Sequence, residues 1–522
     1  MSSWLIVQDR LVDIYDVIAK IDVETITFTR IGGYKSTPYS STLDLFTQLS
    51  PKSLKGVWRW WARAAIVGAY KGSIGYREAN EHLDMIFGGV GEGKGISSYT
   101  LRIEEISDEE TFSARKREIT KICKKLDTFY KSVRDFLQKQ SQQQILPEKS
   151  EVSIRLNVVN PAVIIKNEEG RLNKNHLNIV HTLIMSGPLK EHCTSKPQLK
   201  REGKEIRVDL SITNSKMLNE YINIPRVRLL LMKRVGEEDT LTRDNFNKQE
   251  VQKSVTKYLE RVKEEIAGLL TKGLRFRIWL SGSKDTLKVN FALSSLILSL
   301  IFGGVGSITR RGFGSLKLLS MMIKEDVKID PELKNIIDRL QSSGLASEVK
   351  QILEELCKIT INYAAKTFQI PVKKTQEIPK VPSLSNIKIE VIECVDFNFQ
   401  KIGEVFLKQR WKRHPTEPGR ELHTWILGLP RFQENTGYAV KRDNKYDPLR
   451  RLSSIGVRCF SNQDKSFLII YGLLSDDWPK TLLHIRGKGH PHREKPVNQI
   501  SDGGNLQKVF EGAFKNVLQR LR

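Results

Sequence analysis

Residues 301–314 have the sequence IFGGVGSITRRGFG, in which five glycines surround two arginines. We call residues 303–314 the glycine loop. An apolar segment, 291–302, precedes it, and a strand-like run, 315–323, follows it. Glycine permits positive φ angles and the close approach of another molecule, so backbone N–H groups and arginines in such a loop can hold phosphates. A helix-to-strand connection with solvated arginines explains the same pattern equally well.

The loop differs from the common nucleotide-binding motifs. No Gly-Lys-Ser/Thr follows the glycines, as a mononucleotide P-loop requires. The dinucleotide motif follows a strand and opens a helix, whereas the order here is reversed. The hexamer IFGGVG of residues 301–306 also occurs at 86–91, again between a helix-like segment and a strand-like run, 99–106. This repeat predicts two related α–β units, with chance recurrence as the alternative.

Length and composition narrow the class of protein. A chain of 522 residues with 39% hydrophobic residues is long enough for two or three domains. A formal net charge of +25 favours a polyanionic partner, which is nucleic acid more often than an anionic membrane. No run of eighteen apolar residues predicts a membrane span, and the aspartates within 1–21 argue against a secretory signal. Five scattered cysteines without a C-x-x-C motif fit a reducing cytoplasm.

The stretch 54–70, LKGVWRWWARAAIVGAY, predicts a helix with a broad apolar arc that packs on a sheet. Lys55, Arg59 and Arg63 recur every four residues and form a narrow basic stripe on the other side, with Trp58 at its border. Such a stripe is either a solvated face or a track for phosphates, and the adjacent aromatic residue makes the two interpretations about equal.

Hydrophobic periodicity predicts the remaining elements. The expected strands are 23–31, 99–106, 153–159, 206–213, 274–280, 315–323, 387–394 and 467–474. The expected helices are 54–70, 77–87, 113–144, 255–272, 291–302, 331–342, 345–367 and 506–521. In the strand 274–280, Arg275 and Arg277 should point away from the apolar face.

Several segments are basic without a regular pattern. Residues 167–204 form either a linker loop or an RNA-contacting arm, and their polar, turn-rich composition slightly favours the linker. Residues 371–385 are rich in proline and lysine and are the best candidate for a linker between domains. Dense basic patches occur at 410–413 and 487–495.

Three features together resemble the RAMP superfamily, RNA-binding proteins of CRISPR systems. They are the arginine-rich helix with a double tryptophan at 54–65, the strand that leads into Ile31-Gly32-Gly33-Tyr34, and the glycine loop with RRGFG at 310–314. Within the superfamily the combination looks closest to the head subunit of the Cmr effector complex of type III-B systems. The resemblance extends over residues 20–325 and is looser in the C-terminal third.

The resemblance implies an α+β fold made of ferredoxin-like, or RRM-like, domains. We therefore expect an N-terminal RAMP domain, 1–325, that carries a helical insertion, 113–144. A helical segment with the linker, 326–385, should lead to a second RAMP-like α+β domain, 386–522.

It also implies a non-catalytic RNA-binding subunit of a cytoplasmic ribonucleoprotein. The partners would be guide RNA, single-stranded target RNA and other RAMP subunits, with no membrane, metal or cofactor, because target cutting in the family is attributed to another subunit. The residues expected to contact RNA, through cations, an aromatic border and loop N–H groups, are Lys55, Trp58, Arg59, Arg63, Gly303, Gly304, Gly306, Arg310, Arg311, Gly312, Phe313 and Gly314.

Two other functions compete with this hypothesis. Some RAMP proteins are metal-independent endoribonucleases that process guide RNA, often with a histidine as general acid or base. Here no histidine precedes His82, and His490 and His492 have no neighbouring carboxylate pair. A membrane-peripheral protein would need bulky apolar residues on helix 54–70, whereas Ala64 and Ala65 suit close packing against protein.

Overall fold

The computed structural model describes residues 17–29, 49–89, 96–140, 150–156, 158, 161–167, 170–200, 203–212, 215–225, 227–228, 240–242, 244–267, 272–306, 308–371, 376–407, 424–429, 431–433, 436–442, 445–447, 451–462, 465–479, 481–486, 493–496 and 506–522. The chain divides into two compact units. The first takes its residues from Met1–Ile31, Gln48–Ser107 and Thr271–Arg522, and the second from Gly32–Thr47 and Asp108–Leu270.

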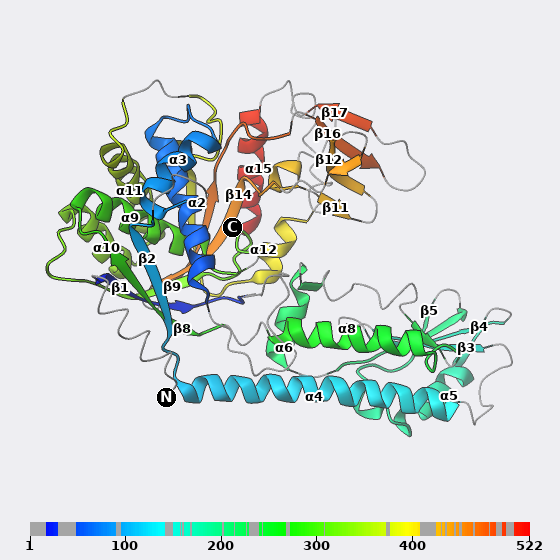
Figure 1. Cartoon of the computed structure of the whole chain (residues 1–522). Coiled ribbons are helices and arrows are strands. Elements are labelled where there is room, and N and C mark those ends of the chain that lie inside the picture. Colours follow the sequence, from blue (N-terminus) through cyan, green and yellow to red (C-terminus); the bar gives the residue numbers. More distant parts are fainter. Residues whose placement is uncertain are drawn as a thin grey trace. The chain divides into compact units, whose positions relative to one another are not determined.

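The first unit begins with a four-stranded antiparallel sheet in the order β2-β8-β1-β9 (Figure 1). Its strands are β1 (Val17–Thr25), β2 (Tyr99–Glu105), β8 (Arg275–Gly282) and β9 (Leu316–Ile323). Helix α2 (Pro51–Ala69), followed by α3 (Tyr76–Phe87), connects β1 to β2, and α9 (Thr286–Leu298) connects β8 to β9. This is the β-α-β-β-α-β order of a ferredoxin-like domain, with the fourth strand beside the first, as expected.

Helix α9 is the apolar core of this domain. The segment Thr286–Gly303 is long and apolar enough to cross a membrane, but 78% of it is buried inside the protein. A helix that is hydrophobic on all sides is typical of the core of a large domain. The helix ends in a π-helical turn, η4 (Ser299–Gly303), which leads directly into the glycine loop.

The second half of this unit repeats the same plan in part. Strands β10 (Lys388–Cys394), β14 (Ile455–Asn462) and β15 (Lys465–Gly472) form an antiparallel sheet in the order β10-β15-β14. Helix α12 (Phe399–Val405) follows β10, and α15 (Leu506–Leu521) follows β15. The order β-α-β-β-α matches a ferredoxin-like domain whose fourth strand is absent from the part of the chain that the structure describes.

The first unit also contains two helices that lie between the two domains in sequence, and a separate small sheet. The helices are α10 (Pro331–Ser342) and α11 (Ala346–Thr367), as expected. A separate sheet is interleaved with the second domain and consists of β11 (Arg431–Gln433), β12 (Thr436–Arg442), β13 (Lys445–Asp447), β16 (Thr481–Arg486) and β17 (Arg493–Pro496).

The second unit is inserted between β2 and β8 and is larger than the helix expected at 113–144. Its sheet has the order β5-β6-β4-β3-β7, formed by β3 (Ser150–Arg155), β4 (Ala162–Asn167), β5 (Gln198–Lys200), β6 (Glu205–Asp209) and β7 (Thr240–Thr242). Its main helices are α4 (Glu109–Gln140), α5 (Lys174–Met185), α6 (Lys216–Asn223) and α8 (Gln249–Ala267).

The region 167–204, interpreted as a loop, contains helix α5 in this unit. The side chain of Asn173 accepts hydrogen bonds from the N–H groups of Asn175 and His176 and caps the helix. The polar composition of the segment obscures the hydrophobic periodicity of this helix. Its N-cap residue is therefore its clearest signal in the sequence. Other boundaries differ by a few residues: the strand expected at 23–31 ends at Thr25, and the helix expected at 255–272 ends at Ala267. The patch at 410–413 lies outside the described residues.

Close packing of α15 on β15 gives a direct test of the second domain. A Cβ atom at Gly472 would lie 2.5 Å from Phe510 and 3.0 Å from Phe514 of α15, whereas one at Gly56 of α2 meets nothing within 4 Å. We expect Gly472→Ala to destabilise the protein by about 1–3 kcal/mol through overpacking. Gly56→Ala, on an exposed helix position, should stabilise it by about 0.5–1 kcal/mol. Urea unfolding measures both, and equal stability of the two variants would contradict the packing.

Candidate nucleic-acid interface

Glycine is required in the glycine loop for two reasons: the backbone has positive φ angles, and neighbouring atoms leave no room for a Cβ atom. Gly304, Gly306, Gly312 and Gly314 have φ angles between 60° and 83°, a region that other residues rarely adopt. A Cβ atom at Gly314 would lie 1.8 Å from the carbonyl oxygen of Val305. At Gly303 it would lie 2.3 Å from Val57, so α2 approaches the loop as closely as glycine allows.

Most of the loop is turned inward. The N–H groups of Gly304, Gly312 and Gly314 donate to the carbonyl oxygens of Ser299 (3.0 Å), Thr309 (3.2 Å) and Phe28 (2.9 Å), respectively. Phe313 is 1% exposed and packs against Phe399. The expectation that these three N–H groups and Phe313 contact RNA is therefore wrong, because protein atoms already occupy them. Gly306 is exposed, and residues 308–311 are half-buried.

A buried arginine of β14 holds the loop from inside. Arg458 is 0% exposed. Its Nη1 donates to the carbonyl oxygens of Thr309 (2.7 Å) and Phe313 (2.6 Å), its Nη2 to that of Gly314 (2.8 Å), and its Nε to that of Ile301 (3.3 Å). No carboxylate among the described residues accompanies these bonds. Burial lowers the pKa of Arg458 to about 10, so it remains a cation at neutral pH.

The loop also pairs with the second domain through its backbone. The N–H of Val457 in β14 donates to the carbonyl oxygen of Arg310 (3.1 Å), and the N–H of Cys459 donates to the hydroxyl of Ser315 (3.0 Å). The hydroxyl of Tyr471 in β15 donates to the carbonyl oxygen of Phe302 (3.2 Å). The loop is therefore the seam between the two ferredoxin-like domains.

Arg311 stabilises the contact between the two domains at this seam. Its Nη2 donates to the carbonyl oxygen of Leu427 (3.0 Å), and its guanidinium lies 3.5 Å from the ring centroid of Phe406. A guanidinium held on a carbonyl and an aromatic face in this way is already engaged. Arg311 thus has a structural role in the fold, which the sequence pattern did not separate from a role in binding.

The basic stripe of α2 packs against protein. The ammonium of Lys55 donates to the hydroxyl of Ser97 (2.8 Å). Arg59 donates to the carboxylate of Asp84 in α3 (2.7 Å) and to the carbonyl oxygen of Gly88 (2.7 Å). The stripe is therefore neither a solvated face nor an open track for phosphates, because its first two cations are used to dock α3 and the segment after it.

Trp58, expected at the border of the stripe, lies in the core. It is 0% exposed, and its indole N–H donates to the carbonyl oxygen of Ala292 (3.1 Å) and the hydroxyl of Ser295 (2.9 Å) in α9. Its ring packs on its edge against Phe87, with 4.6 Å between centroids. The prediction that it contacts RNA is wrong, because a helix that packs on α9 must turn this side chain inward.

The third cation of the stripe joins a cluster at the seam. Arg63 lies over the ring of Tyr76 with 5.4 Å to its centroid, and the hydroxyl of Tyr76 donates to Asp477 (2.6 Å). Arg451 donates to the same carboxylate (2.7 Å). Arg310 interacts electrostatically with Arg451, Tyr76 and Asp477. We call Arg63, Arg310 and Arg451 the arginine cluster.

The charges of the arginine cluster are not balanced. Asp477 is the one carboxylate that the described residues place against Arg451 and Arg310, and Arg63 is connected to it only through Tyr76. Burial lowers the pKa of Arg310, which lies 5.0 Å over the ring of Trp60. The Nε atoms of Arg63 and Arg451 are buried and have no hydrogen-bond partner. A buried donor without an acceptor is costly, so an anion bound here would supply charge and acceptors together.

Comparison with known families identifies the fold. The RAMP superfamily matches residues 22–317, which is more than half of the chain. The chain belongs to the RAMP superfamily. The match begins in β1 and ends in β9, so it spans the first ferredoxin-like domain and the unit inserted into it. No curated protein matches the sequence.

A solved structure has a similar fold. A chain of the type III-B Cmr-beta bound to cognate target RNA and AMPPnP, in the presence of ssDNA, has a TM-score of 0.54 at 14% identity over 97% of this chain and 100% of that chain. A chain of Cmr-beta bound to cognate target RNA gives 0.49 at 13%, covering 96% and 100%. Cmr1 from Pyrococcus furiosus gives 0.41 at 15%, covering 95% and 96%.

Two histidines that a RAMP endoribonuclease could use as general acid or base lie in hydrogen-bonding positions within the fold. The Nε2 atom of His82 lies 2.8 Å from the hydroxyl of Tyr70, and burial lowers the pKa of His82. His192 is buried with its Nδ1 3.2 Å from the carbonyl oxygen of Ser211. No group of three potential metal ligands occurs among the described residues. His490 and His492 lie outside them.

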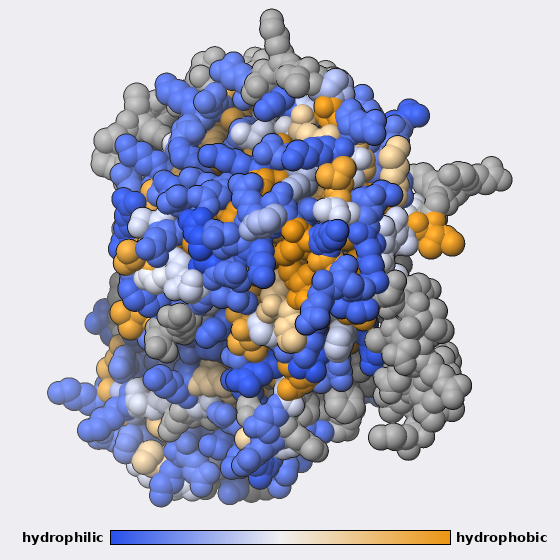
Figure 2. Space-filling model, turned by 90° about the vertical axis from the view of Figure 1, so that its left-hand side faces the viewer, coloured by the Kyte–Doolittle hydropathy of each residue, from blue (hydrophilic) through white to orange (hydrophobic). Residues whose placement is uncertain are grey.

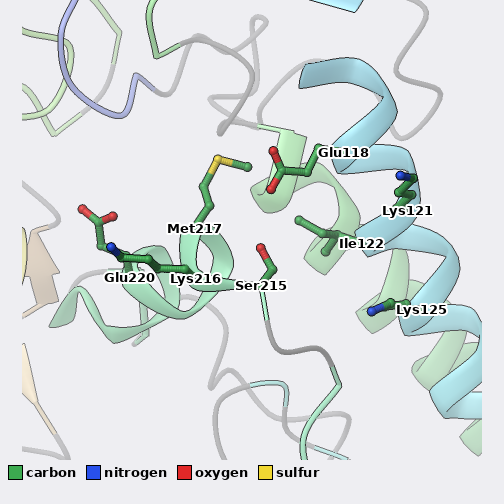
Figure 3. A pocket seen from close by; sticks show the side chains of 8 residues that line it. All are labelled: Glu118, Lys121, Ile122, Lys125, Ser215, Lys216, Met217 and Glu220. Carbon is green, nitrogen blue, oxygen red and sulfur yellow. The ribbon is translucent and has the colours of Figure 1, made fainter. Parts of the chain in front are cut away.

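The inserted unit has a hollow of about 570 Å³ between α4 and α6 (Figure 3). Met217 of α6 points toward Glu118 of α4 across it. Its lining combines three lysines and two glutamates with small or apolar residues: Glu118, Lys121, Ile122, Lys125, Ser215, Lys216, Met217 and Glu220. None of the predicted RNA-contacting residues lines it, and its charges nearly cancel.

Arg458 and Arg451 are the residues that sequence reasoning missed at the seam. Arg458 interrupts the apolar strand IGVRCF, and a single charge in such a run is the one local signal of a buried arginine. Arg451 has no such signal, because its partner Asp477 is remote in sequence.

Removing Arg458 should unfold the seam. Arg458→Ala removes a guanidinium that donates to four carbonyl oxygens, of which, among the described residues, only those of Thr309 and Gly314 keep a second donor, from Gly312 and Val305. We therefore expect a loss of about 3–5 kcal/mol in the free energy of unfolding. Arg458→Lys should recover only part of this, because one ammonium cannot reach four acceptors. Arg77→Ala, at a side chain that is 94% exposed, is the control and should change stability by less than about 0.5 kcal/mol. Similar denaturation midpoints for Arg458→Ala and Arg77→Ala would exclude this role.

Proposed function

We propose that this RAMP protein is a non-catalytic RNA-binding subunit of a type III-B Cmr ribonucleoprotein effector. The observation that carries the proposal is the arginine cluster at the seam. Asp477 pairs with Arg451 and interacts with Arg310, which also donates to the carbonyl oxygen of Ser453, and Arg63 stacks on the tyrosine that donates to Asp477. The cluster lies next to the half-buried Trp60 and the accessible part of the glycine loop, residues 306 and 308–311.

The geometry favours a phosphate over other anions. Packing fixes all three arginines: Tyr76 stacks on Arg63, Trp60 stacks on Arg310, and Ser475 and Asp477 hold Arg451. Fixed guanidiniums with donors to spare match the spaced oxygens of a phosphodiester backbone. Hydrophilic residues cover most of the face shown in Figure 2, with a smaller apolar area between them. The net charge of +25 gives long-range attraction to a polyanion.

The comparisons support RNA as that polyanion. The structures similar to this chain are described as Cmr assemblies bound to cognate target RNA. We infer that guide RNA and single-stranded target RNA are the ligands and that other RAMP subunits of the complex are the protein partners, in the cytoplasm and away from membranes. Cutting of the target would then belong to another subunit.

Charge removal at the cluster tests the proposal. We expect Arg310→Gln and Arg63→Gln each to weaken binding of labelled single-stranded RNA several-fold. Each should also lower the slope of log K against log[salt] by about 0.7, since one phosphate contact is lost. Lys358→Gln on the exposed side of α11 removes the same charge away from the seam and should leave the slope unchanged. Electrophoretic mobility shifts at several salt concentrations give both quantities.

The same gels report on catalysis. We expect intact RNA with and without divalent metal. Specific metal-independent cleavage that disappears on histidine substitution would replace this proposal with that of a processing endoribonuclease. If both cluster variants behave like Lys358→Gln, the cluster is structural and the RNA-binding site lies elsewhere.

A further inference from the structure

The first sheet has one face that the seam does not use. Helices α2 and α9 cover one side of the sheet (Figure 1). The side chains that alternate toward them, such as Ile21 in β1 and Ile278 in β8, are 0% exposed. The side chains between them are half-buried or exposed, including Met322 of β9 at 62%. This second side reaches solvent, and we call it the outer face.

The strand register aligns a row of residues across the outer face. Lys20 of β1 lies opposite Trp279 of β8 on one side and Met322 of β9 on the other. Trp279 lies in turn opposite Arg102 of β2. Directly opposed residues in an antiparallel sheet project from the same face. One row therefore runs Met322, Lys20, Trp279, Arg102 across all four strands, with the tryptophan on a central strand.

Cations surround the indole of Trp279. The ammonium of Lys20 lies 5.8 Å and the guanidinium of Arg277 lies 5.9 Å from its ring centroid. The ring is half-buried, and its N–H is shielded from solvent and has no acceptor among the described residues. An indole N–H without an acceptor also occurs at Trp425 and Trp478, so the cations beside the ring and its place on a solvent-facing sheet are what mark Trp279.

Two acidic side chains of the outer face are paired with arginines, and a third, Glu104 of β2, is exposed and lies opposite Arg277. Arg277 donates to both carboxylate oxygens of Asp22 (2.9 and 3.1 Å), and Arg275 donates to Glu24 (3.1 Å). The bonds from Arg277 hold the pKa of Asp22 below its usual range. These pairs confirm that Arg275 and Arg277 point away from the apolar side. They also form a rigid row beside Trp279 and keep these two carboxylates from repelling a nearby phosphate.

We propose that the outer face binds single-stranded RNA, with one base stacked on Trp279 and the adjoining phosphates near Lys20 and Arg102. An aromatic ring on a central strand of an open four-stranded sheet, with cations beside it, is the arrangement that stacks an unpaired base. Duplex RNA is excluded as the occupant, because its bases are stacked on one another. The inference rests on the proposed function and adds a second contact to RNA, separate from the arginine cluster.

Stacking and phosphate contacts give different signatures in one experiment. With the full-length protein and a labelled single-stranded RNA of mixed sequence, we expect Trp279→Leu to weaken binding about tenfold, as loss of one stacked base does. The salt slope should stay unchanged, because no phosphate contact is removed. Trp279→Phe keeps a smaller ring and should lose about threefold. Phe397→Leu, an aromatic residue outside the sheet, is the matched control and should bind like the wild type.

The outcomes distinguish the proposed outer-face site from the proposed site at the arginine cluster. Normal binding by Trp279→Leu, with weakened binding by Arg310→Gln, overturns the outer-face site and leaves the seam. Absence of any binding by the wild type overturns both. Thermal unfolding of Trp279→Leu shows whether the variant is folded. Should it not fold, cross-linking of wild-type protein to RNA that contains 4-thiouridine takes its place. Cross-links at Trp279 or its neighbours on the outer face support the site, and cross-links confined to other segments reject it.

Discussion

The guanidinium of Arg458 lies inside the glycine loop, and the two ferredoxin-like domains of the first unit meet around it. A buried cation without a counterion is tolerated only if its N–H groups are satisfied, and carbonyl oxygens of the loop do this. They converge on one side chain because the backbone turns through positive φ angles. At Gly304 a Cβ atom would lie 1.9 Å from the guanidinium. The glycines are thus fixed by an arginine that follows them by about 150 residues.

Periodicity and the resemblance to a family were enough to predict the ferredoxin-like topology and the main helices. They did not assign partners. Lys55, Arg59 and Trp58 have the spacing of a binding stripe, yet the atoms that engage them come from α3, α9 and the segment before β2. A helical wheel shows which residues share a face and does not show what covers that face. The inserted unit was underestimated for a related reason, since two of its strands have only three residues and its helices and strands were not recognised as one unit.

The arginine and lysine side chains of this protein have two kinds of role. Arg59, Arg311 and Arg458 each end on a carboxylate, a carbonyl group or both, and they hold elements together. At the arginine cluster and on the outer face the cations also lie against aromatic rings. Three of them donate to oxygens as well: Arg310 to the carbonyl of Ser453, Arg451 to Asp477 and Arg277 to Asp22. A ring attracts a cation without neutralising it, so Lys20, Arg63 and Arg310, which form no ion pair among the described residues, keep their positive field. The difference explains why a net charge of +25 is compatible with a well-packed core.

The place of the inserted unit has a consequence for folding. Strands β2 and β8 are hydrogen-bonded neighbours, and Ser107 and Arg275 bond to each other where the chain leaves and re-enters the sheet. In a ferredoxin-like domain without an insertion, a short hairpin turn would join these strands. Here their pairing must close a loop of more than 160 residues, at an entropic cost that falls if the insertion is already compact. The topology therefore favours folding of the insertion before the sheet that carries it.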